Sequence, residues 1–189
     1  MRRFHQALLI GSFLPLCWLA MMAIHELGHV TVAVASGGRV ERVVLYPLTI
    51  SRTDVSPNPH PLLVVWAGPS VGILLPLALL VLVRLCKLSW AYLAEFFAGF
   101  CLIANGSYIG AGSLQRIGDA GDLLRHASPM WLLWLFGLVA VPFGLYLWNG
   151  LGPRFGLGAA AGKVEHRAAY VSCVVLLLVL IVEFVFSPR

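Results

Sequence analysis

The feature that most constrains this chain is a series of long apolar runs. Each run has about 20 residues or more, the length that an α-helix needs to cross the roughly 30 Å hydrocarbon core of a bilayer. Of the 189 residues, 60% are hydrophobic and only 11% are charged, whereas soluble domains carry about 25% charged residues. The sequence therefore predicts an all-α polytopic membrane protein and excludes an ordinary water-soluble fold.

Five of these runs are predicted to span the membrane. Their limits fall where glycine, proline or charged residues interrupt the apolar pattern. The first run is too long for a perpendicular span, so we expect it to tilt or to leave the bilayer at one end. The five predicted spans cover residues 7–36, 62–83, 90–112, 130–148 and 168–186.

The N-terminal run shares features with a secretory signal, because a basic start is followed by small residues up to Ala23. The apolar pattern resumes over residues 30–35, so we expect a retained span. The net charge is +5, but the basic residues lie in short stretches beside the apolar runs, as membrane-flanking charge does. They divide almost evenly between the two sides of the bilayer and set no orientation. We expect the lipid bilayer and no nucleic acid as a partner, with the protein in the cell membrane.

Three connections have distinct patterns. Residues 37–53 are rich in β-branched residues that partly alternate with polar ones, which predicts a β-hairpin, and Pro47 would restrict its strand to an edge position. Residues 56–61 contain alternating prolines and are expected to form an extended linker. Residues 151–162 are rich in glycine and alanine and are expected to be a flexible connection without a functional signal.

The first predicted span contains the motif His25-Glu26-Leu27-Gly28-His29. On a helix the i, i+4 spacing places both imidazoles on one face, where they can bind one Zn²⁺, with Glu26 beside them as a general base. A charged residue at mid-bilayer costs about 2.5 to 3.5 kcal/mol, so such residues are candidates for function. The alternative is that they are hydrogen-bonded helix residues at an interface, which leaves three polar side chains without evident partners.

A catalytic zinc site usually has three protein ligands, so a third residue is required. Asp119 and Asp122 follow the third span, where small neighbours would let a carboxylate approach a metal closely. Alternatively, either aspartate caps a short helix through residues 123–125. The remaining candidates are Glu95 and Glu183 within spans, and Asp54, His60, His126 and His166 in connections.

Together these motifs resemble the site-2 protease family of intramembrane zinc metalloproteases, peptidase family M50, and within it the M50B-like group. Residues 25–29 match the HExxH motif of the first core helix, and residues 37–53 match the membrane-associated hairpin. Ala67-Gly68-Pro69 resembles the Gly-Pro element. Residues 119–124 resemble the Asp-Gly motif of the third core helix, although Ala120 replaces the usual glycine.

The resemblance covers residues 7–131. The length of 189 residues predicts a single domain over 1–189. Its catalytic core would lie at about 7–131, with extra C-terminal helices at about 130–186. The resemblance implies Zn²⁺ as the cofactor and Glu26 as the catalytic residue. The metal ligands would be His25, His29 and Asp119, because in the family the aspartate stands four residues before an aliphatic pair, which selects Asp119 over Asp122.

The same resemblance implies hydrolysis of peptide bonds in single-span membrane proteins or leftover signal peptides, with release of a soluble fragment. Asn105 would contact the substrate or the oxyanion, and the alternative is a polar helix-packing patch. Gly68 and Pro69 are interpreted as punctuation at the start of a helix, and the alternative is a direct role in catalysis. The alternative functions are a non-catalytic membrane scaffold and a metal-ion carrier, but a pure binder needs the ligands and has no need of Glu26 as a base.

Overall fold

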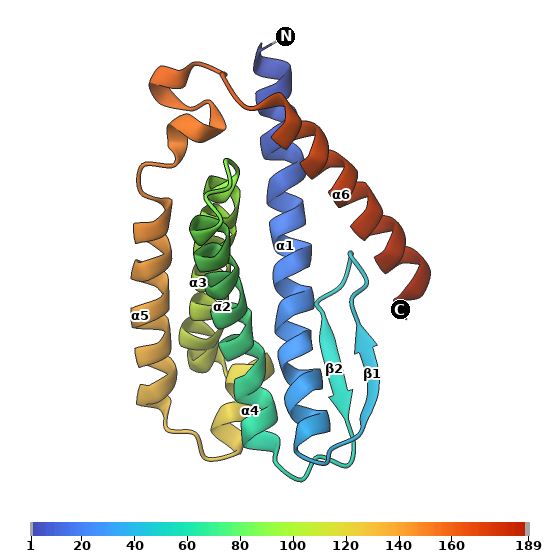
Figure 1. Ribbon diagram of the computed structural model, residues 1–189. Coiled ribbons are helices and arrows are strands. Elements are labelled where there is room, and N and C mark those ends of the chain that lie inside the picture. Colours follow the sequence, from blue (N-terminus) through green and yellow to red (C-terminus); the bar gives the residue numbers. More distant parts are fainter. Residues whose placement is uncertain (1, 188–189) are drawn as a thin grey trace.

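The computed structural model describes residues 2–187 and is a bundle of five long helices with one short helix and a two-stranded sheet (Figure 1). Its α-helices are α1 (Arg2–Ala35), α2 (Pro61–Leu85), α3 (Ala91–Gln115), α4 (Gly118–Arg125), α5 (Met130–Trp148) and α6 (His166–Phe186). Its strands are β1 (Val40–Val44) and β2 (Arg52–Val55), and two short 3₁₀ helices are η1 (Gly152–Phe155) and η2 (Gly158–Ala160).

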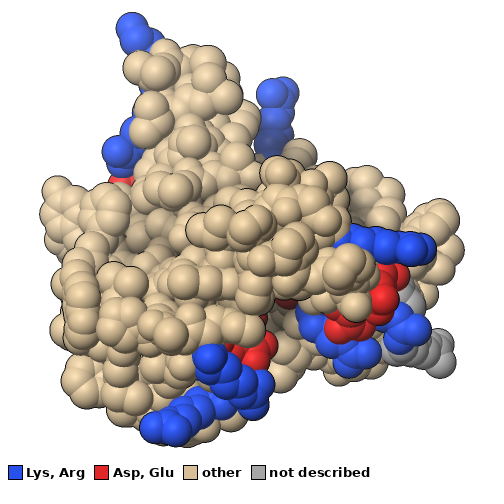
Figure 2. All heavy atoms as spheres, turned by 90° about the horizontal axis from the view of Figure 1, so that it is seen from below, with Lys and Arg blue, Asp and Glu red and all other residues tan. Residues whose placement is uncertain are grey.

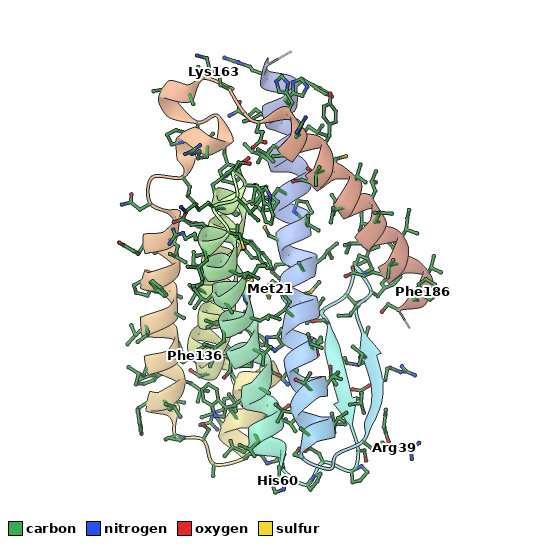
Figure 3. The ribbon with its side chains drawn as sticks, in the orientation of Figure 1. Met21, Arg39, His60, Phe136, Lys163 and Phe186 are labelled. Carbon is green, nitrogen blue, oxygen red and sulfur yellow. The ribbon has the colours of Figure 1, made fainter. Side chains whose placement is uncertain are left out.

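The five long helices are apolar and long enough to cross a membrane. Their polar connections lie at the two ends of the bundle: Lys163 lies at one end and His60 at the other, with Met21 between them (Figure 3). Helix α1 has 34 residues and, at about 1.5 Å per residue, is longer than the roughly 30 Å hydrocarbon core. The prediction of five spans is confirmed, and the chain is a multi-pass integral membrane protein.

Helices α3 and α5 form the most extensive contact of the bundle, and small residues permit it. A Cβ atom at Gly106 would lie 2.8 Å from Cβ of Ala140, and one at Gly110 would lie 3.2 Å from Cα of Gly137. Between helices in lipid there is little hydrophobic driving force, so close backbone approach is a main source of packing energy. This contact holds α3 in place as one wall of the cavity described below.

The predicted hairpin is confirmed, because β1 and β2 are antiparallel neighbours. Val43 pairs with Thr53, and the register is interrupted between Val40 and Arg42. Strand β2 lies between α1 and β1 (Figure 1). Pro47 is in the turn between the strands and not in a strand, so it does not have the predicted effect on an edge strand. A proline has no N–H to donate, and a turn needs none at that position.

The connection over residues 151–162 is more ordered than its composition indicates. Phe155 is buried and stacks on Phe13, with ring centroids 6.1 Å apart. The Gln6 side chain donates hydrogen bonds to the carbonyls of Phe155 and Gly156 at 3.0 and 2.8 Å. The prediction of a flexible connection was therefore wrong, since one aromatic anchor and one amide fix a segment that is otherwise rich in glycine and alanine.

The end of the bundle that carries the hairpin and α4 is seen in Figure 2, where most of the surface is uncharged. Its charged side chains lie in separate groups, in some of which both signs adjoin. At this end Arg52 pairs with Asp54 at 3.5 Å, and Arg125 pairs with Asp122 at 2.6 Å. Over the residues described, this face has no continuous basic patch, a distribution typical of charge that flanks membrane spans.

Candidate metal and catalytic site

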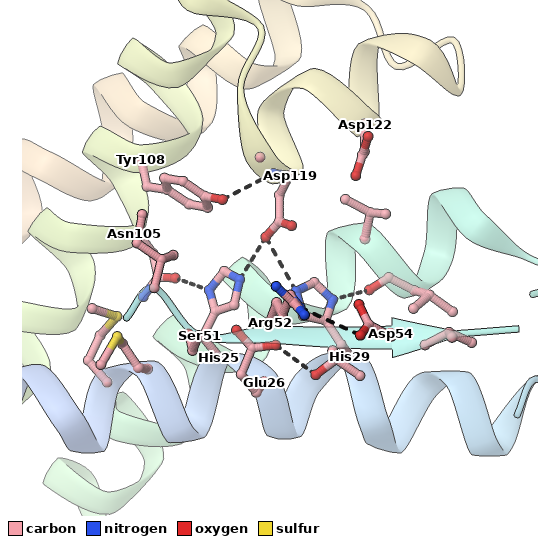
Figure 4. Close-up of a pocket in the computed structure, with 18 of the residues that line it drawn as sticks. His25, Glu26, His29, Ser51, Arg52, Asp54, Asn105, Tyr108, Asp119 and Asp122 are labelled. Atoms are coloured by element: carbon pink, nitrogen blue, oxygen red, sulfur yellow. Dashed lines mark hydrogen bonds and ion pairs between the residues drawn. The ribbon is translucent and has the colours of Figure 1, made fainter. Parts of the chain in front are cut away.

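His25 and His29 lie one turn apart on α1 and meet Asp119 of α4 (Figure 4). Both histidines are buried, and their ring centroids are 4.9 Å apart. Oδ2 of Asp119 lies 2.7 Å from Nε2 of His25 and 3.3 Å from Nε2 of His29. One potential ligand atom from each side chain lies within 4.8 Å of the others. The three side chains could hold one metal ion.

The first turn of α4 carries Asp119 to the histidines. Gly118 has φ +51°, a left-handed conformation that glycine adopts readily, and a Cβ atom there would overlap the Tyr108 hydroxyl. A Cβ atom at Gly121 would overlap the carbonyl oxygen of Arg116. The backbone N–H of Asp119 donates to the Tyr108 hydroxyl at 3.1 Å. Two glycines and one tyrosine thus position the carboxylate.

Asp122 has a different environment, although it also lines the cavity. Its carboxylate accepts a hydrogen bond from Arg125 at 2.6 Å and is 43% exposed. The Asp119 carboxylate is only 19% exposed and lies within 3.3 Å of one imidazole nitrogen of each histidine. The structure therefore brings Asp119, and not Asp122, to the two histidines.

The second ring nitrogen of each histidine faces an acceptor. Nδ1 of His29 lies 2.8 Å from the carbonyl oxygen of Val64, which can only accept, so this nitrogen carries a proton. Nδ1 of His25 lies 2.7 Å from Oδ1 of Asn105, whose Nδ2 donates to the carbonyl of Cys101 at 2.9 Å. This amide orientation makes Nδ1 of His25 a donor as well. In the neutral form of each ring, the Nε2 atom then presents its lone pair to the carboxylate.

Three electron-rich atoms thus converge on one point. They can approach one another only if protons or a cation lie between them, and two imidazolium ions with centroids 4.9 Å apart would repel each other in a buried site. A shared metal ion satisfies all three atoms at once. Two imidazole nitrogens and a carboxylate oxygen, with the outer nitrogens hydrogen-bonded, form a donor set that Zn²⁺ binds. The residues fit a metal ion.

Glu26 lies next to this cluster and is only 3% exposed. One carboxylate oxygen, Oε2, accepts a hydrogen bond from the Thr53 hydroxyl of β2 at 2.6 Å. The other oxygen forms no hydrogen bond with the part of the chain that the structure describes. A carboxylate within a span is costly, and the hydroxyl of Thr53 offsets part of that cost. The hairpin therefore positions the carboxylate, and one oxygen remains available for chemistry.

Helix α2 passes directly behind the two imidazoles at Gly68. A Cβ atom at this position would lie 2.6 Å from Nε2 of His25 and would overlap the ring of His29. The interpretation of Gly68 and Pro69 as the start of a helix is wrong, because α2 begins at Pro61 and both residues lie inside it and are buried. Gly68 instead provides the space in which the imidazoles meet the carboxylate.

We expect Gly68→Ala to lower the metal affinity of the purified protein at least tenfold. The added methyl group overpacks the site, which costs about 1–3 kcal/mol, and must push the imidazoles away from Asp119. Gly11→Ala is the matched control, since a Cβ atom at Gly11 of α1 has no neighbour within 4 Å. Metal affinity is measured by competition with a chelator. Equal affinities for the two variants would contradict this role of Gly68.

The cluster lines a cavity of about 1130 Å³ between α1, α3, α4 and β2. This volume exceeds the range of about 300–1,000 Å³ that is typical of small-molecule sites. Away from the cluster the wall becomes apolar, with Trp18 and Met21 of α1 and Ile103 of α3. The cavity therefore has an apolar part and a polar part, and the polar part contains Glu26. It has room for a segment of polypeptide.

The other candidate ligands lie apart from the histidines. Glu95 pairs with Arg84 at 2.6 Å, and His166 stacks on His5 with ring centroids 3.9 Å apart. Within residues 2–187, the group of His25, His29 and Asp119 is the one cluster found that could hold a metal ion. The cluster does not include Asp54 and His126, which line the cavity, or His60 and Glu183, which do not.

Asn105 lines the cavity and also contacts His25. Its side chain is 1% exposed, and its amide contacts His25 and Cys101. A Cβ atom at Gly72 of α2 would lie 2.9 Å from both amide heteroatoms, so α2 packs tightly against the amide. The contact with substrate stays a prediction, whereas the observed contact holds the ring of His25.

Sequence reasoning did not single out Thr53, Tyr108 or the carbonyl of Val64. Tyr108 lies three residues after Asn105 and therefore shares a face of α3 with it. That spacing was a signal that could have identified the tyrosine. Thr53 and Val64 had no such signal, because their contacts with the α1 motif depend on how the hairpin and α2 pack against α1.

The fold and the cluster define a multi-pass membrane protein with a candidate metal centre inside its helical bundle. Residues 6–109 match the sequence model of the family described as Peptidase M50B-like. The match includes more than half of the chain, and the chain belongs to this family. It covers the HExxH motif, the hairpin and α2, and ends before Asp119. No curated protein and no solved structure matched the chain.

Proposed function

We propose that this protein is an intramembrane zinc metalloendopeptidase that acts in regulated intramembrane proteolysis. The observation that carries the proposal is that both histidines of the HExxH motif, the adjacent Glu26 and the distant Asp119 face one cavity inside a bundle of membrane spans. His25, His29 and Asp119 would hold Zn²⁺. The family of the chain supports this proposal, because M50 peptidases are generally zinc-dependent.

The residues around the cluster have distinct tasks. Bound there, Zn²⁺ supplies a Lewis acid for the scissile carbonyl and a lower pKa for the attacking water. Glu26 accepts a proton from that water and delivers it to the leaving amide nitrogen. The hydroxyl of Thr53 orients the Glu26 carboxylate. Asn105 and the carbonyl of Val64 are positioning groups that would hold the two imidazoles with Nε2 toward a bound ion.

The proposed substrates are single-span membrane proteins or leftover signal peptides. A helical substrate hides its carbonyls in hydrogen bonds and must be locally unwound. The edge of β2 that pairs with no strand of residues 2–187, its free edge, can pair with the unwound segment. The N–H of Ser56 donates to the carbonyl of Arg39 at 2.8 Å, on the side of β1. Along a strand the N–H groups of successive residues point to opposite edges. The N–H groups of Thr53 and Val55 therefore point away from β1. Both residues line the cavity.

We expect Val55→Pro to reduce cleavage at least tenfold without loss of zinc. Proline removes an N–H donor from the free edge and obstructs an added strand, while the hydrogen bonds between β1 and β2 remain. Val55→Ala is the control, because it shortens the side chain and keeps the N–H. Cleavage and zinc content are measured on the same preparations. If both variants cleave equally well, the substrate does not pair with this edge.

The proposed function is tested by cleavage of a panel of single-span substrates with the purified protein, with zinc content determined in parallel. Zinc at one ion per chain together with cleavage supports the peptidase. Zinc at that ratio without cleavage of any substrate would favour a non-catalytic scaffold, and zinc uptake into vesicles would favour a carrier. Absence of zinc binding would contradict the proposed centre.

A further inference from the structure

We propose that Tyr108 is a second catalytic residue, whose hydroxyl donates a hydrogen bond to the oxygen of the scissile carbonyl as negative charge develops there. This inference rests on the proposed peptidase function and adds to it. It assigns a task to a cavity residue that neither holds the metal nor acts as the base.

The position of Tyr108 places its hydroxyl at the metal cluster. The residue lies on α3 one turn after Asn105, is half-buried and lines the cavity. Its ring packs edge-on against that of His25, with centroids 5.9 Å apart and an interplanar angle of 70°. Figure 4 shows the phenol extending from α3 toward Asp119. The hydroxyl is therefore held beside two of the three proposed ligands.

The hydrogen bonding of this hydroxyl is incomplete. Its oxygen accepts the backbone N–H of Asp119 at 3.1 Å, and a phenol also has one proton to donate. Over residues 2–187 no acceptor for that proton is found. The absence of a side chain at Gly118 leaves the space in which the hydroxyl lies. An oriented donor without an acceptor, at the wall of a cavity, is available to a substrate oxygen.

The tyrosine complements Glu26 in space. Glu26 reaches the cluster from α1, whereas Tyr108 reaches it from α3, and Figure 4 shows them on different sides of the His25 ring. Amide hydrolysis needs a base for the attacking water and a donor for the carbonyl oxygen. The two side chains stand where they can serve these two needs at the same time.

The step balances with these groups. The water oxygen forms a bond to the carbonyl carbon, and the electron pair of the C=O double bond moves onto oxygen, where the Tyr108 hydroxyl donates its hydrogen bond and keeps its proton. Glu26 takes a proton from the water. The C=O bond then re-forms, the C–N bond breaks, and Glu26 gives the proton to the leaving nitrogen.

The test is Tyr108→Phe, which removes the hydroxyl and keeps the ring. Loss of one oxyanion donor typically lowers kcat about 10²–10³-fold, so we expect kcat measured at saturating zinc to fall about 100-fold with KM unchanged. Tyr146→Phe is the matched control, because Tyr146 is 72% exposed on α5 and lies outside the cavity lining. The measurements are kcat, KM and zinc affinity by chelator competition.

A structural role would give a different result. If Tyr108 acted only by holding Asp119, the variant would bind zinc more weakly and excess zinc would restore kcat. Restoration of kcat by excess zinc would overturn the inference, and so would an unchanged kcat. A phosphinic peptide, whose tetrahedral oxygens mimic the developing charge, provides a second readout. Tyr108→Phe should bind this peptide at least tenfold more weakly than the wild type does, and equal binding would overturn the inference. This readout needs no cleavage by the wild type. A wild type that cleaved no substrate would contradict the peptidase function and not the role of Tyr108.

Discussion

Replacing Glu26 by glutamine is expected to abolish cleavage and leave the zinc content unchanged. In the proposed mechanism this carboxylate accepts a proton from the attacking water, and general bases contribute about 10²–10⁴-fold. We therefore expect cleavage to fall at least 100-fold. The amide oxygen of glutamine can still accept the hydrogen bond from Thr53, and a neutral side chain is less costly within a span, so the fold should be retained.

The matched control for this variant is Glu183→Gln. Glu183 is also a buried glutamate of a membrane span, on α6, and it is not part of the metal cluster. Its variant should cleave like the wild type. Full activity in Glu26→Gln would remove this residue from the mechanism. A metal carrier or scaffold would also retain its function in Glu26→Gln, because such a protein needs the ligands and has no use for a base.

The second large effect is expected from Asp119→Ala, which should lose zinc and cleavage together. Partners that merely orient a ligand change metal affinity about 10–100-fold, so removal of a direct ligand should lower it by more than 100-fold. Asp122→Ala is the control, since Asp122 forms an exposed pair with Arg125. The measurement is zinc affinity by chelator competition for both variants. The reverse pattern, with zinc lost only in Asp122→Ala, would make Asp122 the third ligand.

Local spacing in the sequence was enough for the parts of this protein that depend on one segment at a time. The lengths of the apolar runs predicted all five spans, and the separation of His25 and His29 predicted that both rings share one face of a helix. These features follow from the 3.6-residue period of the helix and from the thickness of the bilayer, so they need no knowledge of neighbouring segments. The hairpin pattern of residues 37–53 was readable for the same reason.

Asp119 and Asp122 show where local spacing was insufficient. Both carboxylates stand among small residues three positions apart, and residues alone left the choice between them open. The resemblance to a family selected Asp119, and the packing of α4 brings that residue to the histidines. Gly68 is a similar case, because its position in the chain looked like the start of a helix, whereas its contact with the imidazoles depends on how α2 crosses α1.

Residues far apart in the chain make up the rest of the site. Asn105 comes from α3, Thr53 from β2 and the carbonyl of Val64 from α2, and each meets the α1 motif through tertiary contacts. Such contacts arise from the packing of whole helices in lipid, where small residues set how closely backbones approach. The motif over residues 25–29 therefore indicated the kind of chemistry. Only the packing of distant segments determined the third potential ligand and the groups that orient the histidines and the base.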